Sequence, residues 1–162
     1  MGVGKGTIAR EMVKSSDYVA LDTDDIIESM ENKSVKEIFS EDGEEYFRAL
    51  EKKVSLWLEK SVKNTLISTG GGFYKQKNIK DIGIVVLLNS PFDKILQRIQ
   101  EHPNAEKKLK KRPLLKDIKK ASKLYEERLG EYLKVADIVI DVTDKSASEC
   151  VKEILKKVKK YA

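Results

Sequence analysis

The chain has 162 residues and a formal net charge of +5, a length that corresponds to one domain with a buried core. No apolar run approaches the roughly 18 residues of a membrane span, and a single cysteine, Cys150, excludes an internal disulfide and favours the reducing cytoplasm. Because 27 acidic residues are interspersed among 32 basic ones without an aromatic-interleaved basic stripe, we expect anionic small molecules rather than nucleic acid as partners.

The chain opens on the glycine-rich stretch MGVGKGTIAR. Gly2 and Gly4 let the backbone curl into a nest of N–H groups for phosphate oxygens. A helix expected over Thr7–Lys14 adds its N-terminal dipole, and Lys5 is placed to reach the β- and γ-phosphates of a nucleotide. The stretch therefore matches the second half of the phosphate-binding pattern G-x-x-x-x-G-K-[ST]; a flexible tail is the alternative interpretation.

The stretch departs from the full pattern at two points. The first glycine would lie ahead of Met1, and Gly6 stands where a hydroxyl usually binds Mg²⁺. Thr7 is one place further on, and we expect either Thr7 or an additional water to replace that hydroxyl.

Acidic residues follow the first predicted strand, the apolar run Tyr18–Leu21. Asp22 and Asp24 are two positions apart, so their side chains can project to the same side. One is suited to a hydrated Mg²⁺ and the other to accepting a hydroxyl proton. Helix capping is the alternative role, and Thr23 or Asp24 is expected to cap the next helix.

Two helices are expected next. Ser34 and Glu37 form a capping box for a short helix. The second helix carries on one face the apolar residues Phe47, Leu50, Val54, Trp57 and Leu58. Arg48 lies in the same helix, with Glu51 three residues on to hold its guanidinium; a surface ion pair is the alternative.

A second predicted strand, Thr65–Ser68, runs into Gly70, Gly71 and Gly72. Three successive glycines weaken any helix or strand, so they indicate a close backbone approach to a ligand. A mobile turn is the alternative.

The second half of the chain alternates in the same way. Strands are predicted over Ile82–Leu88 and Ile138–Val142, a long helix over Leu115–Val135, and a terminal helix that opens at Ser146 or Ser148. Between them, residues 101–113 are polar and rich in lysine, which is typical either of a solvated face or of a lid that closes over ATP.

Strands that alternate with helices predict a parallel sheet in an α/β layer fold. In such folds, ligands bind beyond the carboxyl ends of the strands. The glycine-rich loop, the two aspartates and the triple glycine all fall at those ends. No repeat or linker divides the chain, so we expect a single domain over residues 1–162.

In order and spacing, these motifs resemble the shikimate kinase family of the nucleoside monophosphate kinase-like P-loop enzymes. The resemblance covers nearly the whole chain and rests on residues 2–7 (GVGKGT), 21–24 (LDTD), 43–51 (GEEYFRALE), 68–72 (STGGG), 112–115 (RPLL) and 125–128 (YEER) with Tyr132, Ala136 and Asp137. It implies a three-layer α/β/α P-loop kinase fold with strand order 2-3-1-4-5, a substrate-binding helical region at about 24–61 and a lid at about 101–116. It also implies ATP-dependent phosphorylation of the 3-hydroxyl of shikimate, in aromatic amino-acid biosynthesis.

The resemblance also implies roles for individual residues on the ATP side. ATP is bound by the loop residues Gly2, Val3, Gly4, Lys5, Gly6 and Thr7. Arg98 lies against adenine, and Arg112 stabilises charge on the transferring phosphoryl group from the lid. Asp22 orients Mg²⁺ through water, with Thr7 as the second metal residue.

On the shikimate side, the resemblance implies that Asp24 contacts the acceptor hydroxyls and is the candidate base. Arg48 and Arg128 clamp the carboxylate, for which planar bidentate guanidinium groups are suited. The glycines Gly70, Gly71 and Gly72 contact the same ring.

Members of the family begin with an apolar strand that is central in their sheet. Nothing precedes Met1 here, so we expect that the sequence is truncated. Two other functions stay open: a small kinase of the same fold acting on a nucleoside monophosphate or gluconate, which Gly6 favours, and a non-catalytic nucleotide-binding remnant, which the missing strand favours. A monomer without membrane or nucleic-acid partners is expected.

Overall fold

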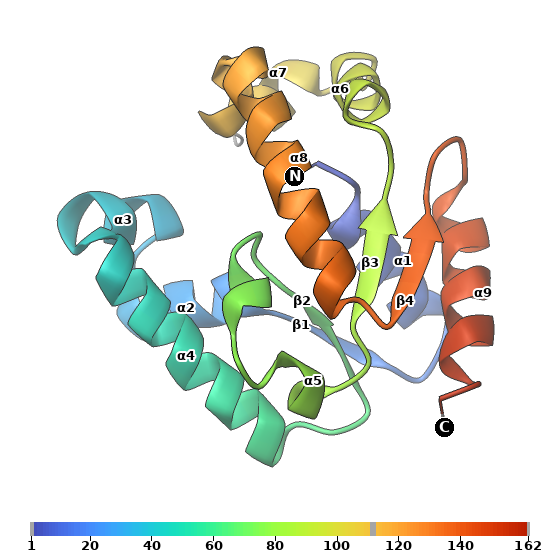
Figure 1. Ribbon diagram of the computed structural model, residues 1–162, viewed down its shortest axis with the longest axis horizontal. Coiled ribbons are helices and arrows are strands. Elements are labelled where there is room, and N and C mark those ends of the chain that lie inside the picture. The colour runs from blue at the N-terminus through green and yellow to red at the C-terminus, as the bar shows by residue number, and fades with distance from the viewer. Residues whose placement is uncertain (1, 111–112, 162) are drawn as a thin grey trace. The chain divides into compact units, whose positions relative to one another are not determined.

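The computed structural model describes residues 2–110 and 113–161, in which helices and strands alternate along the chain (Figure 1). The chain forms two compact units, one of residues 6–85 and one of residues 86–162 together with residues 1–5. We call them the 6–85 unit and the 86–162 unit. The single domain predicted for residues 1–162 stays a prediction. No helix within the described ranges is long and apolar enough to cross a membrane.

The 6–85 unit contains a pair of parallel strands, β1 (Val19–Asp22) and β2 (Thr65–Ser68), in a register that places Val19 opposite Thr65 and Asp22 opposite Ser68. Its other elements are α1 (Lys5–Ser15, whose first residue belongs to the 86–162 unit), α2 (Thr23–Glu31), α3 (Val35–Glu41), α4 (Gly43–Ser61), the 3-10 turn η1 (Phe73–Lys75) and α5 (Ile79–Ile82). Because the strands are parallel, Asp22 and Ser68 end them at the same edge.

The core of this unit lies between α2, α3, α4 and η1, where α4 packs on α2 and α3 (Figure 1). It contains Ile27, Ile38, Phe47, Leu50, Val54, Leu58 and Phe73. Four of the five residues predicted for the inner face of α4 are in this core. The fifth, Trp57, is 45% exposed, so its placement there was wrong. Leu58, the next residue, is fully buried, as predicted.

Two of the three helix caps predicted from the sequence are confirmed. Ser34 with Glu37 forms the predicted capping box. Ser146, one of the two residues predicted to open the terminal helix, forms a second capping box with Glu149. The cap of α2 is Asp22, not Thr23 or Asp24, because the Asp22 carboxylate accepts hydrogen bonds from the first backbone N–H groups of the helix.

The 86–162 unit has its own parallel pair, β3 (Val86–Asn89) and β4 (Ile138–Asp141), which lie side by side with α9 (Ala147–Val158) against β4 (Figure 1). Its other elements are α6 (Phe92–Gln100), α7 (Ala105–Lys110), the 3-10 turn η2 (Pro113–Lys116) and α8 (Ile118–Val135). The long helix begins at Ile118 rather than Leu115, because the Asp117 side chain caps it by accepting the N–H of Lys120.

The mixed α/β architecture with parallel strands is confirmed. If the strand expected ahead of the glycine-rich loop is counted as the first, the pairs β1–β2 and β3–β4 are the neighbours 2-3 and 4-5 of the predicted order.

Candidate active site

The glycine-rich loop has the backbone geometry of an anion-binding nest. Gly2 and Gly4 have φ angles of 66° and 98°, in the left-handed region that favours glycine, and Val3 between them is buried. Helix α1 begins directly afterwards at Lys5, so its first backbone N–H groups are presented beside the nest. Lys5 is half-buried and Thr7 is exposed. This local geometry fits a phosphate ligand.

The side chain of Arg98 on α6 binds the backbone of the glycine-rich loop. Its Nη1 donates to the carbonyl oxygen of Val3 and its Nη2 to that of Val142, both at 3.4 Å. Val142 directly follows β4, so one guanidinium links the loop to the end of a strand in the same unit. The contact with adenine that the sequence predicts for Arg98 stays a prediction.

The end of β1 is tied to the triple glycine. Thr23 is fully buried, and its Oγ1 accepts a hydrogen bond from the N–H of Gly70 at 3.2 Å. Asp24 is half-buried with its Oδ1 covered, and its own N–H donates to Asp22 Oδ1 at 2.9 Å. A Cβ added at Gly70 would lie 2.7 Å from Asp24 Oδ1, so the carboxylate lies directly on the glycine backbone.

Arg48 is held in place by two carboxylates on its own helix. Its Nη1 lies 2.6 Å from Glu51 Oε2 and its Nη2 lies 3.0 Å from Glu44 Oε1. The rings of Phe39 and Phe47 lie 6.0 and 5.5 Å from its Cζ. Burial lowers the pKa of Arg48, but the hydrogen bonds to Glu51 and Glu44 outweigh it, so the pKa lies above its usual value.

Glu51 is not part of a surface ion pair, because only 1% of it is exposed. Its second oxygen, Oε1, has no hydrogen-bond partner among the described residues. A buried carboxylate of this kind depends strongly on its cationic partner. The sequence predicted Glu51 as the partner of Arg48 but missed Glu44, although its spacing of four residues on the same helix could have revealed it.

Gly72 lies beneath the guanidinium of Arg48. A Cβ added at Gly72 would lie 2.8 Å from Arg48 Cζ and 2.9 Å from its Nη2. The 6–85 unit therefore brings together two side chains and two glycines that the sequence singled out: Asp24 with Gly70, and Arg48 with Gly72. Gly71, between them, is exposed.

Arg128 on α8 is a half-buried guanidinium, and neither a hydrogen bond nor an ion pair joins it to any other described residue. Its helix is anchored one turn earlier by Tyr125, whose hydroxyl donates to the carbonyl oxygen of Ser90 at 2.5 Å. Burial raises the pKa of Tyr125. The helix therefore carries Arg128 on a fixed backbone with its charge available to an anion.

Replacing Tyr125 with Phe should lower the free energy of unfolding by about 1–3 kcal/mol, because the carbonyl of the fully buried Ser90 loses its donor. Tyr161→Phe is the matched control, since its hydroxyl bonds the Asp137 carbonyl at the surface. We expect the control to change stability by less than about 0.5 kcal/mol. Urea denaturation measures both, and equal losses would contradict the anchoring role.

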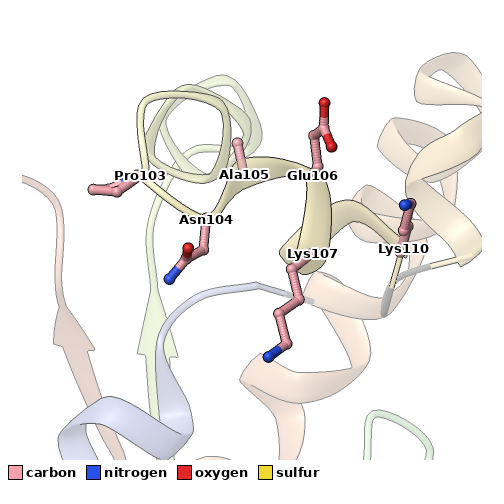
Figure 2. A pocket seen from close by; sticks show the side chains of 6 residues that line it. All are labelled: Pro103, Asn104, Ala105, Glu106, Lys107 and Lys110. Atoms are coloured by element: carbon pink, nitrogen blue, oxygen red, sulfur yellow. The ribbon is translucent and has the colours of Figure 1, made fainter.

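The predicted lid contains a pocket of about 470 Å³ (Figure 2). In Figure 2, the side chains of Asn104 and Lys107 extend to one side of the segment and Glu106 extends to the other. Among the described residues, the pocket is lined by Pro103, Asn104, Ala105, Glu106, Lys107 and Lys110. Arg112, predicted to act from this lid, lies outside the described residues.

Asp22, at the end of β1, fits a weakly held, hydrated Mg²⁺. Within the described ranges there is no group of three or more acidic, histidine or cysteine side chains that could hold a metal ion. Mg²⁺ commonly binds through one or two carboxylates, several waters and phosphates. Asp22 uses Oδ1 for the helix cap, which leaves Oδ2 for a hydrated cation.

Comparison with known proteins gives matches over nearly the whole chain. A family model described as shikimate kinase matches residues 1–159. Similar proteins include a shikimate kinase of Helicobacter hepaticus, 41% identical over 155 residues, which are 96% of this chain and 89% of that protein. A shikimate kinase of Clostridium botulinum is 40% identical over 150 residues, which are 89% of this chain and 85% of that protein.

Solved structures agree with these matches. The shikimate kinase of Acinetobacter baumannii in complex with shikimate has a TM-score of 0.82 at 30% identity, over 99% of this chain and 89% of that one. The shikimate kinase of Aquifex aeolicus has a TM-score of 0.78 at 34% identity, over 98% of this chain and 92% of that one.

Proposed function

This chain belongs to the shikimate kinase family, and we propose that it transfers the γ-phosphoryl group of ATP to the 3-hydroxyl of shikimate. The match to the family over residues 1–159 carries this proposal. The arrangement of Asp24 and Arg48 in the 6–85 unit supports it, because a carboxylate and a guanidinium suit a hydroxyl and a carboxylate on one small substrate.

We assign shikimate to Asp24, Arg48 and Arg128. Arg48 and Arg128 bind the substrate carboxylate: Arg48 is already oriented by Glu51, and Arg128 has no competing partner among the described residues. Asp24 accepts the proton of the 3-hydroxyl as it attacks the phosphoryl group. The backbone of Gly70, Gly71 and Gly72 contacts the ring. In this assignment the helical region at about 24–61 binds shikimate.

ATP is assigned to the loop. The nest formed by Gly2, Val3 and Gly4 and the first N–H groups of α1, at Gly6 and Thr7, bind the phosphates. Lys5 neutralises charge on the transferring group. Arg98 packs on adenine, and Arg112 acts from the lid at about 101–116.

Mg²⁺ is assigned to Asp22 through water and to Thr7; when bound, it neutralises phosphate charge. Gly6 is exposed with an ordinary φ, and a Cβ there would lie 3.4 Å from Arg10 Nη1, so Gly6→Ser should be accommodated. We expect Gly6→Ser to lower the Mg²⁺ concentration for half-maximal ADP binding several-fold and Thr7→Ala to raise it. Titration calorimetry measures this, and an unchanged Mg²⁺ requirement in both variants would refute the assignment.

The proposed reaction is tested by a coupled ADP-release assay that offers shikimate, nucleoside monophosphates and gluconate separately. We expect turnover with shikimate alone. Turnover of another acceptor instead would replace the proposed substrate. ATP binding without turnover of any acceptor would make the chain a nucleotide-binding protein only.

The location and the oligomeric state stay predictions. Cys150 is a buried free thiol, which is consistent with the proposed cytoplasmic location. Cell fractionation would test the location, and size-exclusion chromatography would test the expected monomer.

A further inference from the structure

We propose that Gly70 and Gly72 are positioning residues: the absence of a side chain at each makes the room that the Asp24 carboxylate and the Arg48 guanidinium occupy. The packing is independent of any substrate. Its effect on shikimate rests on the proposed function.

The backbone does not require glycine at either position. Gly72 has φ −104° and ψ −6°, which any residue adopts, and Gly70 is likewise outside the left-handed region. Gly2 and Gly4 differ, because their positive φ angles favour glycine directly. The reason for glycine at 70 and 72 therefore lies in the space around them.

At Gly72 that space is filled by the guanidinium of Arg48. On its other side, the guanidinium is bonded to the buried Glu51 at 2.6 Å and lies 5.5 Å from the Phe47 ring. A Cβ would approach Cζ to 2.8 Å, well inside van der Waals contact, so the guanidinium would have to leave Glu51. Because the displaced atoms end a flexible side chain, the backbone of the variant should still fold.

At Gly70 the space is filled in the same way by the carboxylate of Asp24. Its Cγ and Oδ2 would both lie 3.3 Å from an added Cβ, in addition to the closer Oδ1. The N–H of Gly70 is bonded to Thr23 Oγ1 at the start of α2, so a shift of the Gly70 backbone would break this bond. The carboxylate would have to turn out of its position.

The two substitutions should therefore give different kinetic signatures. Gly72→Ala displaces a residue that binds the carboxylate and should raise the KM for shikimate by about 10- to 100-fold, the value of a lost charge-assisted hydrogen bond. Gly70→Ala displaces the proposed base and should act mainly on kcat. The KM for ATP should change less than about twofold in both.

A double-mutant cycle distinguishes positioning from direct contact between glycine and substrate. Gly72→Ala is measured in the natural protein and in an Arg48→Ala background. If Gly72 acts through Arg48, the substitution should change the KM for shikimate by less than about twofold once Arg48 is absent. An equal change in both backgrounds would overturn the proposal. Gly130→Ala on α8, where an added Cβ meets nothing within 4 Å, is the control and should leave the KM unchanged.

A second cycle requires no substrate. Gly72→Ala should lower the urea midpoint of the natural protein, because it separates Arg48 from Glu51, but not that of Arg48→Ala/Glu51→Gln. Equal lowering in both proteins would refute the packing argument. If the natural protein fails to phosphorylate shikimate, the proposed function fails, and this denaturation cycle still decides the role of Gly72.

Discussion

Replacement of Asp24 with Asn should lower kcat for shikimate phosphorylation by about 10²- to 10⁴-fold, the usual contribution of a general base. Asn has nearly the same shape, so the contact with Gly70 and the start of α2 should be kept. It cannot take up a proton from the 3-hydroxyl. We therefore expect the loss in kcat, with the KM for ATP changed less than about twofold.

Asp25 offers a matched control for this substitution. It is the next residue on α2, exposed, and its pKa is raised by burial, by Asp22 and by Glu28. Asp25→Asn removes a charge at nearly the same place and should leave kcat within about twofold. Steady-state rates at saturating ATP compare the two variants. A kcat that Asp24→Asn leaves unchanged, or that both variants lower equally, would show that Asp24 is not the base.

What could be predicted from the sequence is what depends on residues close together in the chain. The capping box at Ser34 depends on Glu37, three positions on, and is confirmed, as is the start of the terminal helix at Ser146, one of the two predicted positions. The inner face of α4 follows from helical periodicity, which failed only at Trp57, at the margin of the apolar face. The parallel strands were likewise predicted from alternating apolar runs and helices.

The missed features depend on contacts between distant segments. The hydrogen bond between Thr23 and Gly70 joins residues 47 positions apart, and no pattern around Thr23 points to it. The triple glycine indicated a close approach of a ligand to the backbone, and that ligand contact stays a prediction. The approaching groups within the chain are the side chains of Asp24 and Arg48, which lie in other elements. Packing of this kind is decided by tertiary structure and leaves no local spacing to read.

Replacement of Arg48 with Ala should have two separable effects, one on stability and one on shikimate. The variant leaves Glu51 as a buried charge without its cation, and loss of one partner of a buried pair costs about 3–5 kcal/mol. We expect the lower end, about 3 kcal/mol, because 27% of the Arg48 side chain is exposed to water. The KM for shikimate should rise by about 100-fold or more with the loss of a bidentate contact to its carboxylate.

The double variant Arg48→Ala/Glu51→Gln separates the two effects. A neutral amide at 51 removes the buried charge, so the free energy of unfolding should return most of the way to that of the natural protein. The KM for shikimate should stay high, because no guanidinium has been restored. As a control, Lys52→Ala removes an exposed positive charge from the same helix. It should change the free energy of unfolding by less than about 0.5 kcal/mol. Urea denaturation measures the free energy of unfolding of these variants, and titration with shikimate measures the KM. Recovery of shikimate affinity together with stability would mean that Arg48 serves only the fold, and the carboxylate would then need another partner.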